Sequence, residues 1–225
     1  MDDPARAAVR NNAAWCDTVC RSHGLTTMYD ARFWVTAARP PAFYPDAVTL
    51  DPTHLPAEIL ARIDDTPGAS IKDSFAVLDL NRFGYNVLFD AEWYLLEPDR
   101  RRPPVEGGWS FVETPAELAS WAAAHGGGDV FRAALLDDPE VRILVRHLHG
   151  GGLAGAIANR AAGVVGVSNV FAPGTAEGAW EGLVHAIGVM FPGEAIVGYD
   201  TGQHLRAALS QGFRTIGPLR VWMRR

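Results

Sequence analysis

Lysine is nearly absent from this sequence. Lys72 is the single lysine, and the other 19 of the 20 Lys and Arg residues are arginine. A phosphate-binding loop of the G-K-[ST] type requires a lysine directly after a glycine, so this class of nucleotide site is excluded. Because alanine and glycine are abundant as well, we interpret the imbalance as a bias of genomic composition.

Cysteine is also scarce, with only Cys16 and Cys20 in the chain. The apolar residues around them keep helical spacing, so the two thiols would lie one turn apart on the same face of a helix. Such a pair is poorly oriented for a disulfide, and two thiolates alone do not form a metal site. We therefore interpret both as small buried side chains and expect no metal.

The sequence has no apolar run of about 20 residues, the length that a membrane-spanning helix needs. Its first residues, MDDPARAAVRNN, lack the apolar segment of a secretory signal, so the expected location is cytoplasmic. The net charge of −6 and the lack of a basic block argue against nucleic acid as a partner. They are compatible with a cationic amine as substrate.

The length of 225 residues and the 48% hydrophobic content allow one substantial core or two small ones. Arginine and proline crowd residues 99–104 (DRRRPP), a composition typical of a linker. We therefore expect two regions, an N-terminal α/β region over 1–104 and a second domain over 105–225.

Local signals indicate several elements before the C-terminal region. Apolar spacing predicts a helix over 5–22, and the segment 21–34 that overlaps its end is expected to be irregular. Thr114 followed by Glu117 is a capping box, so a helix should begin there. A second short helix is expected over 130–136.

The C-terminal region carries the clearest order of elements. An unbroken apolar run at 164–171 predicts a buried strand, and apolar residues over 180–191 recur at helical spacing. A second apolar run at 195–199 and a second helical set follow, closed by Gly212. The alternation over 219–223 predicts a last strand with one buried face.

This order of elements, with Gly212 at the last helix-to-strand corner, resembles the C-terminal half of the GNAT superfamily of N-acetyltransferases. Residues 109–161 supply a strand, two helices and two strands, in the order of the first half of that fold. The resemblance covers 105–225 and implies an α/β protein with a mixed sheet and flanking helices. It also implies an acyl-CoA-dependent N-acyltransferase, in which an amine attacks the thioester of acetyl-CoA directly in a ternary complex.

The resemblance also implies where the cosubstrate acetyl-CoA binds. In this family a strand parts from its parallel neighbour and offers its amides to the thioester, and the next loop holds the pyrophosphate at a helix N-terminus. By position, the implied binding residues are Val170, Phe171, Ala172, Gly174, Thr175, Gly178 and Ala179. The candidates for moving protons near them are Ser168, Asn169, Asp200 and His204.

Thr175 stands where the family has Gln or Arg and Thr201 where it usually has asparagine, and two further positions also depart from the family pattern. Trp180 stands where a small residue normally lets the backbone approach phosphate, and Ala208 stands where a tyrosine acid is usual. These losses favour a rival hypothesis, a GNAT-fold protein that has lost catalysis and serves as a binding or assembly module. The two hypotheses differ in whether acetyl transfer is retained.

The N-terminal region contains a short internal match. At an offset of 128 residues, Gly84-Tyr85 falls on Gly212-Phe213. If the match is real, 1–104 is an eroded second copy of the half-fold and the protein is a pseudo-tandem GNAT. The expected partners are acyl-CoA and an amine, with no membrane and no nucleic acid. The identity of the amine stays open, as does the oligomeric state, for which a homodimer is one option.

Overall fold

The computed structural model describes residues 3–53, 55–98 and 108–225. The expected boundary between 104 and 105, and the arginine-rich segment 99–104 that suggested it, lie outside the described residues.

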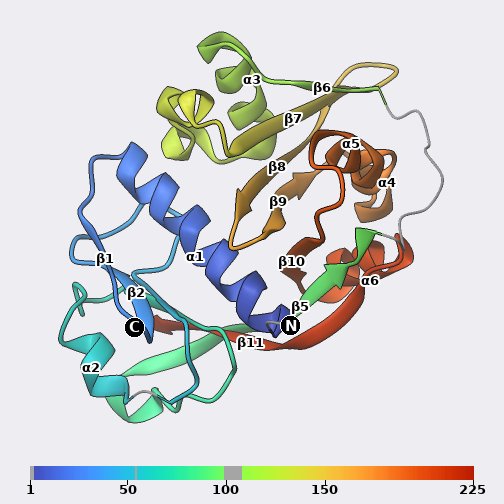
Figure 1. Ribbon diagram of the computed structural model, residues 1–225. Helices are drawn as coiled ribbons and strands as arrows, with labels where there is room; N and C mark the ends of the chain where they lie inside the picture. The colour runs from blue at the N-terminus through green and yellow to red at the C-terminus, as the bar shows by residue number, and fades with distance from the viewer. Residues whose placement is uncertain (1–2, 54, 99–107) are drawn as a thin grey trace.

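Eleven strands of the described chain form one mixed sheet (Figure 1). The strands are β1 (Thr27–Tyr29), β2 (Phe33–Thr36), β3 (Ala47–Thr49), β4 (Ser70–Asp73), β5 (Tyr85–Leu96), β6 (Trp109–Phe111), β7 (Val141–His147), β8 (Leu153–Ala161), β9 (Val164–Phe171), β10 (Ile196–Asp200) and β11 (Arg214–Arg224). Across the sheet they lie in the order β1-β2-β3-β4-β11-β5-β10-β9-β8-β7-β6. The α/β fold class with a mixed sheet is therefore confirmed.

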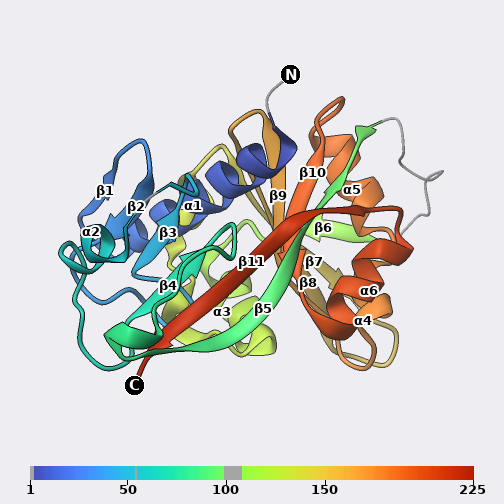
Figure 2. The ribbon, with the colours of Figure 1, turned by 90° about the horizontal axis from the view of Figure 1, so that it is seen from below.

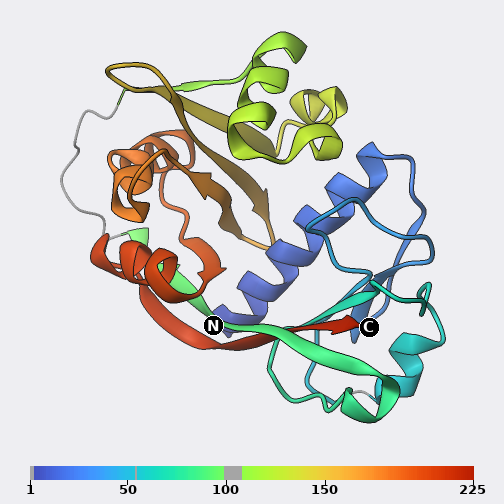
Figure 3. The same cartoon turned by 180° about the vertical axis from the view of Figure 1, so that it is seen from behind.

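Helices cover both faces of this sheet (Figure 3). The α-helices are α1 (Pro4–Ser22), α2 (Pro56–Leu60), α3 (Pro115–His125), α4 (Ala176–Trp180), α5 (Leu183–Met190) and α6 (Gly202–Ser210). Short 3₁₀ helices are η1 (Asn81–Phe83), η3 (Gly128–Val130) and η4 (Ala133–Asp137). One hydrophobic cluster joins α1 and α3 to the sheet, and a second joins α4, α5 and α6 to its other face.

The two ends of the sheet repeat one plan. At one end, neighbouring strands from β1 to β3 are antiparallel, a helix follows, and β4 runs parallel to β3. At the other end, neighbouring strands from β7 to β9 are antiparallel, the helices α4 and α5 follow, and β10 runs parallel to β9. The last strand of each series crosses over: β5 pairs with β10, and β11 pairs with β4. Figure 2 shows β5 and β11 side by side through the middle of the molecule. Each series thus ends in a strand that pairs with the other series, and the two last strands are in this sense exchanged.

Several local predictions are confirmed. The Thr114 hydroxyl accepts a hydrogen bond from the Glu117 amide at 3.2 Å, and the Glu117 carboxylate accepts one from the Thr114 amide at 3.0 Å. Helix α1 begins where Asp3 accepts a hydrogen bond from the Ala5 amide, so the helix expected over 5–22 is present. Cys16 and Cys20 are buried free thiols on that helix.

Three expectations about local structure were wrong. The segment 21–34 holds β1 and part of β2, because each pairs with a strand that the local sequence does not reveal. The helix expected over 130–136 is two 3₁₀ turns. The helix expected over 180–191 is broken at Gly182, whose φ is 69°. The break is stable because the indole of Trp109 donates a hydrogen bond to the Glu181 carbonyl at 2.8 Å.

Candidate functional site

Strands β9 and β10 separate shortly after they begin to pair. Val165 and Gly166 lie opposite Ile196 and Val197, and no later residue of the two strands is paired with the other strand. On its other side, β9 stays paired with β8 but shifts register where Asn169 takes a φ of 53°. This bulge bends β9 away from β10 and leaves a gap between parallel strands, as the resemblance to the GNAT fold implies.

The bulge also decides which backbone groups face the gap. The Val165 amide donates to the Ala195 carbonyl at 2.9 Å, so this residue points toward β10. Along a strand, the backbone groups of successive residues point alternately to the two neighbouring strands. On either side of the bulge, the backbones of Ser168 and Phe171 are directed toward β8, where they pair with Ile157 and Gly155. The backbone of Val170 then faces the gap, where its side chain also lines a cavity.

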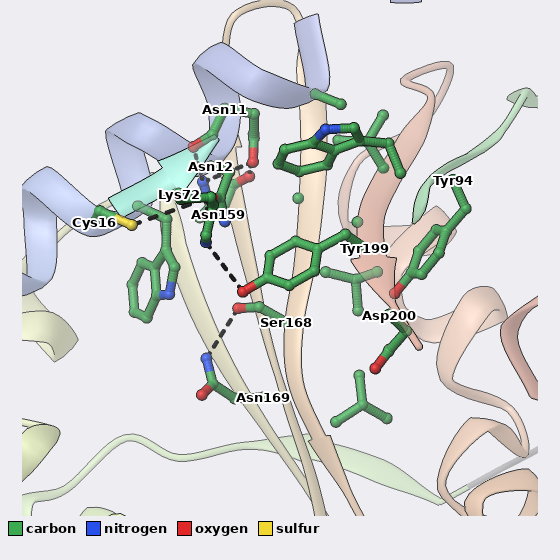
Figure 4. Close-up of a pocket in the computed structure, with 18 of the residues that line it drawn as sticks. Asn11, Asn12, Cys16, Lys72, Tyr94, Asn159, Ser168, Asn169, Tyr199 and Asp200 are labelled. Atoms are coloured by element: carbon green, nitrogen blue, oxygen red, sulfur yellow. Dashed lines mark hydrogen bonds between the residues drawn. The ribbon is translucent and has the colours of Figure 1, made fainter. Parts of the chain in front are cut away.

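The cavity has a volume of about 280 Å³ and passes through the sheet at the gap. Its walls come from both faces, because Trp93 and Tyr94 are consecutive residues of β5 and both line it. Helix α1 and the segment 43–45 close it on the N-terminal side. The cavity therefore joins residues from the two halves of the chain (Figure 4).

Asp200 lies at the end of β10 in this cavity (Figure 4). Burial raises the pKa of its carboxyl to about 6, although nearby His204 and a hydrogen bond with Tyr94 act in the opposite direction. The ring of Tyr94 covers Gly198, where a Cβ atom would meet it at 2.6 Å. Asp200 is therefore a carboxylate that can take up and release a proton near neutral pH.

Lys72 reaches the other end of the cavity from β4 (Figure 4). Its ammonium donates hydrogen bonds to the Asn12 side-chain oxygen at 2.7 Å and to the Tyr199 hydroxyl at 3.0 Å. The nitrogen also lies 4.3 Å from the centre of the Tyr199 ring, a cation–π contact. The cavity thus has a cation at one end and an acid at the other.

Between these ends, polar groups of β9 face Tyr44. The Asn169 side chain donates a hydrogen bond to the Ser168 hydroxyl at 3.0 Å. Tyr44 is 8% exposed, and among the described residues its hydroxyl makes no hydrogen bond of good geometry. Burial raises the pKa of this tyrosine well above its usual value, so the hydroxyl is neutral and can donate a hydrogen bond.

The loop after β9 turns at Gly174, whose φ is 94° and whose missing side chain leaves open space. Thr175 caps α4 by accepting a hydrogen bond from the Gly178 amide at 3.3 Å. Ala179 is buried in the core beneath the loop, and Ala172 is half-buried at its start. The first amides of α4 have no acceptor within the helix, which is the usual property of a helix N-terminus.

Trp180 does not obstruct the cavity. It is 1% exposed and packs edge-on against Tyr94 and Phe213, with ring centres 6.2 Å and 5.4 Å apart. Its indole belongs to the hydrophobic cluster under α4, α5 and α6 and is not among the residues that line the cavity. The large residue at this position therefore leaves the gap open.

Some of the residues named from the sequence line the cavity, and others, including Phe171 and Ala172, do not. Ser168, Asn169, Val170, Asp200 and His204 all line the cavity, whereas Gly174, Thr175, Gly178 and Ala179 form the neighbouring loop and turn. The residues it missed are Tyr44, Lys72, Tyr94 and Tyr199. One signal was available, because Lys72 is the single lysine of the chain.

Comparison with solved structures shows the same architecture in other proteins. A GCN5-related N-acetyltransferase from Kribbella flavida superposes with a TM-score of 0.67 at 15% identity, over 96% of this chain and 95% of its own. The chain has the GNAT fold. A GNAT family protein from Novosphingobium aromaticivorans gives a TM-score of 0.58 at 13% identity, over 94% of this chain and 96% of its own.

The GNAT fold is also found in proteins without a described role. A functionally unknown conserved protein from Staphylococcus epidermidis superposes with a TM-score of 0.60 at 10% identity, over 88% of this chain and 93% of its own. No protein-family model matches the sequence, and no curated protein matches it closely enough to indicate a relationship. These likenesses show the fold, and activity has to be argued from the site.

Two structural findings bear on ligands and location. In the described ranges, no three His, Cys, Asp or Glu side chains gather closely enough to hold a metal ion. No helix in the same part of the chain is long and apolar enough to cross a membrane.

Proposed function

We propose that this protein is an acyl-CoA-dependent N-acyltransferase that transfers an acetyl group from acetyl-CoA to an amine by direct attack in a ternary complex. One observation carries the proposal: β9 leaves β10 after two paired positions, and the cavity with its titratable groups opens at that gap. The GNAT-fold neighbours that are acetyltransferases support the same activity.

The residues around the gap fit acetyl-CoA. An extended pantetheine arm needs a strand edge with free backbone groups, and the part of β9 beyond Gly166 offers one. The pyrophosphate needs an open turn with free amides, and the loop at Gly174 and Thr175 has the required space. When bound, acetyl-CoA supplies the activated acyl group as a thioester.

Residues of the chain would stabilise the developing charge and transfer protons. Strand alternation beyond the bulge places the backbone N–H of Val170 on the side of the gap, where it can polarise the acyl carbonyl oxygen. Asp200 is placed to accept the proton that the amine loses, and His204 is placed to protonate the departing thiolate. Overall a C–N bond forms, a C–S bond breaks, and one proton moves from the amine to the thiol.

The Val170 amide can be removed without touching the pairing with β8. Val170→Pro deletes this one N–H at a bulge, a position where strands can contain proline, and its thermal melt has to show that the preceding Asn169, with a φ of 53°, tolerates the change. Val170→Ala is the matched control, because it shortens the side chain but keeps the amide. We expect the proline variant to lose kcat by about 100- to 1000-fold, as for a lost oxyanion donor. The alanine variant should stay within a few-fold of the wild type.

Binding of acetyl-CoA by calorimetry is the first measurement, followed by release of free thiol with a panel of amines. Thermal melts of both variants establish that they are folded. No heat and no thermal shift at millimolar acetyl-CoA would refute the proposal and leave a GNAT-fold binding or assembly module. Equal loss of activity in the proline and alanine variants would show that the amide has no role.

A further inference from the structure

A second cavity lies behind the first and shares a wall with it. It has a volume of about 550 Å³. Five residues line both cavities and form the wall between them: Phe43, Tyr44, Pro45, Lys72 and Tyr199. Its other walls are mostly apolar and include Pro40, Pro41, Leu88, Phe89, Val221 and Met223. These five residues therefore lie between the mostly apolar second cavity and the first cavity at the β9–β10 gap.

The charged group in this wall is Lys72. The residue is only 4% exposed, and the hydrogen bonds of its ammonium go to the side-chain oxygens of Asn12 and Tyr199. Among the described residues, no carboxylate forms an ion pair with it. Buried charges in proteins are normally paired, because an unpaired one is costly to remove from water. An ammonium has three N–H donors, so one donor remains for an anionic ligand.

The choice of lysine supports the same interpretation. Every other cationic side chain of the chain is arginine, so the bias of the sequence would favour arginine here as well. The guanidinium of arginine is wide and planar, whereas the ammonium of lysine is a compact point charge. A single ammonium with one free donor can make one charge-assisted hydrogen bond to an anionic group such as a carboxylate. A phosphate group would need further donors, and the neighbouring Arg39 is already engaged by Asp46 at 2.9 Å.

The first cavity has a positively charged side chain at one end and a carboxyl group at the other. Lys72 and Asp200 lie on opposite sides of the Tyr199 ring (Figure 4). A molecule with a carboxylate and an amine can therefore place the carboxylate at Lys72 and direct its amine into the first cavity, on the side of the β9–β10 gap. An apolar side chain on the same molecule would occupy the second cavity.

We propose that the acceptor is an apolar amino acid, bound by its carboxylate to Lys72, by its side chain in the second cavity, and with its amine presented to the β9–β10 gap. The inference rests on the proposed function. The bond that forms joins the amine nitrogen to the acetyl carbonyl carbon, and the C–S bond of acetyl-CoA breaks. The proton lost by the amine passes to Asp200, and the thiolate is released as the thiol.

The test compares acceptors that differ only in the anionic group. L-phenylalanine and L-phenylalaninamide share the amine and the aromatic body, but the amide lacks the carboxylate. For the wild type we expect kcat/KM to be about 100-fold higher with the acid, the size of a lost charge-assisted hydrogen bond. Glycine, which lacks the apolar body, should be a poor acceptor as well.

Lys72→Met removes the charge and keeps the shape of the side chain. It should abolish the preference for the acid, so that the acid and the amide give similar kcat/KM values in this variant. Binding of acetyl-CoA to this variant by calorimetry, expected to be unchanged, shows that it is folded. Because the acid-to-amide comparison uses the wild type, it stands even if the variant does not fold.

The outcomes separate the two proposals. If acetyl-CoA does not bind the wild type, the acyltransferase proposal fails and the acceptor proposal fails with it. If acetyl-CoA binds and amines are acetylated, but the acid and the amide react equally well, the acceptor proposal alone is overturned. If the acid is preferred in the wild type and equally in Lys72→Met, Lys72 does not recognise the carboxylate and the assignment is wrong.

Discussion

Asp200 is placed to act as a base, but its burial makes the ionised carboxylate destabilising for the fold. The carboxyl is largely buried in the cavity wall, which raises its pKa to about 6, and it contacts the hydroxyl of Tyr94. Because the folded protein holds this proton more tightly than the unfolded chain does, the ionised form destabilises the fold above pH 6. That loss of stability disappears as the pH falls from 6 toward 4.

Asp200→Asn should therefore separate activity from stability. At pH 7.5 the variant loses the buried charge, so we expect its free energy of unfolding to rise by up to about 3 kcal/mol, from a pKa shift of about two units. Acetyl transfer should fall by at least about 100-fold, the usual contribution of a general base. Urea denaturation at pH 7.5 and at pH 4.5 measures the first effect, and the difference between the two proteins should be smaller at pH 4.5.

The wild-type rate should also follow this group. We expect kcat/KM for acetyl transfer to fall about tenfold per unit as the pH drops below 6, because the protonated carboxyl cannot accept a proton. A profile that is flat between pH 5 and 8 would contradict the assigned role.

At the scale of elements, one buried side chain of α1 bonds directly to the backbone of two strands. Asn11 is 1% exposed, and its amide nitrogen lies 3.0 Å from the Asn159 carbonyl and 3.1 Å from the Val164 carbonyl. In return, the Asn159 side chain donates a hydrogen bond to the Asn11 side-chain oxygen at 3.2 Å. A Cβ on Gly166 would meet that oxygen at 2.0 Å, so the close approach of helix and strand depends on this glycine.

Asn11→Ala should release this anchor. The change leaves buried carbonyls of β8 and β9 without their donor, and we expect a loss of about 2–3 kcal/mol in the free energy of unfolding. Arg10→Ala, at the exposed neighbouring position, is the control and should change it by less than about 0.5 kcal/mol. Because α1 also walls the cavity, acetyl-CoA should bind more weakly to the first variant. Equal urea midpoints for the two variants would show that the anchor does not matter.

At the scale of the whole molecule, the two halves are joined by exchanged strands. Strand β5 lies between β10 and β11, and β11 lies between β4 and β5. Neither half therefore contains all the strands that its end of the sheet uses. The composition of the sequence suggests an N-terminal region and a separate GNAT-like domain, and such a domain would fold alone. The pairing of β5 with β10 and of β11 with β4 predicts that it would not.

A fragment of residues 108–225 should therefore fail to fold, because β10 and β11 each lose the strand that pairs with them. Co-expression with residues 1–98 should restore a complex with the circular dichroism and melting of the intact chain. The control is the full chain cleaved at a protease site inserted between 98 and 108, which should stay assembled. A cooperative melt of the isolated 108–225 fragment would contradict this prediction and support two separate domains.

The sequence alone determined many of the local elements and the order of the strands in 105–225, but not the helices over 130–136 and 180–191. Caps such as Thr114, the apolar periods and Gly212 act over a few residues, so they can be seen in one stretch of chain. The tertiary structure decided which strands pair. The exchange of β5 and β11, and the meeting of Lys72 with Tyr199 at a separation of 127 residues, depend on distant partners that no local period encodes. For the same reason, Trp180 looked like an obstruction in the sequence, and only its packing against Tyr94 and Phe213 shows that the cavity is open.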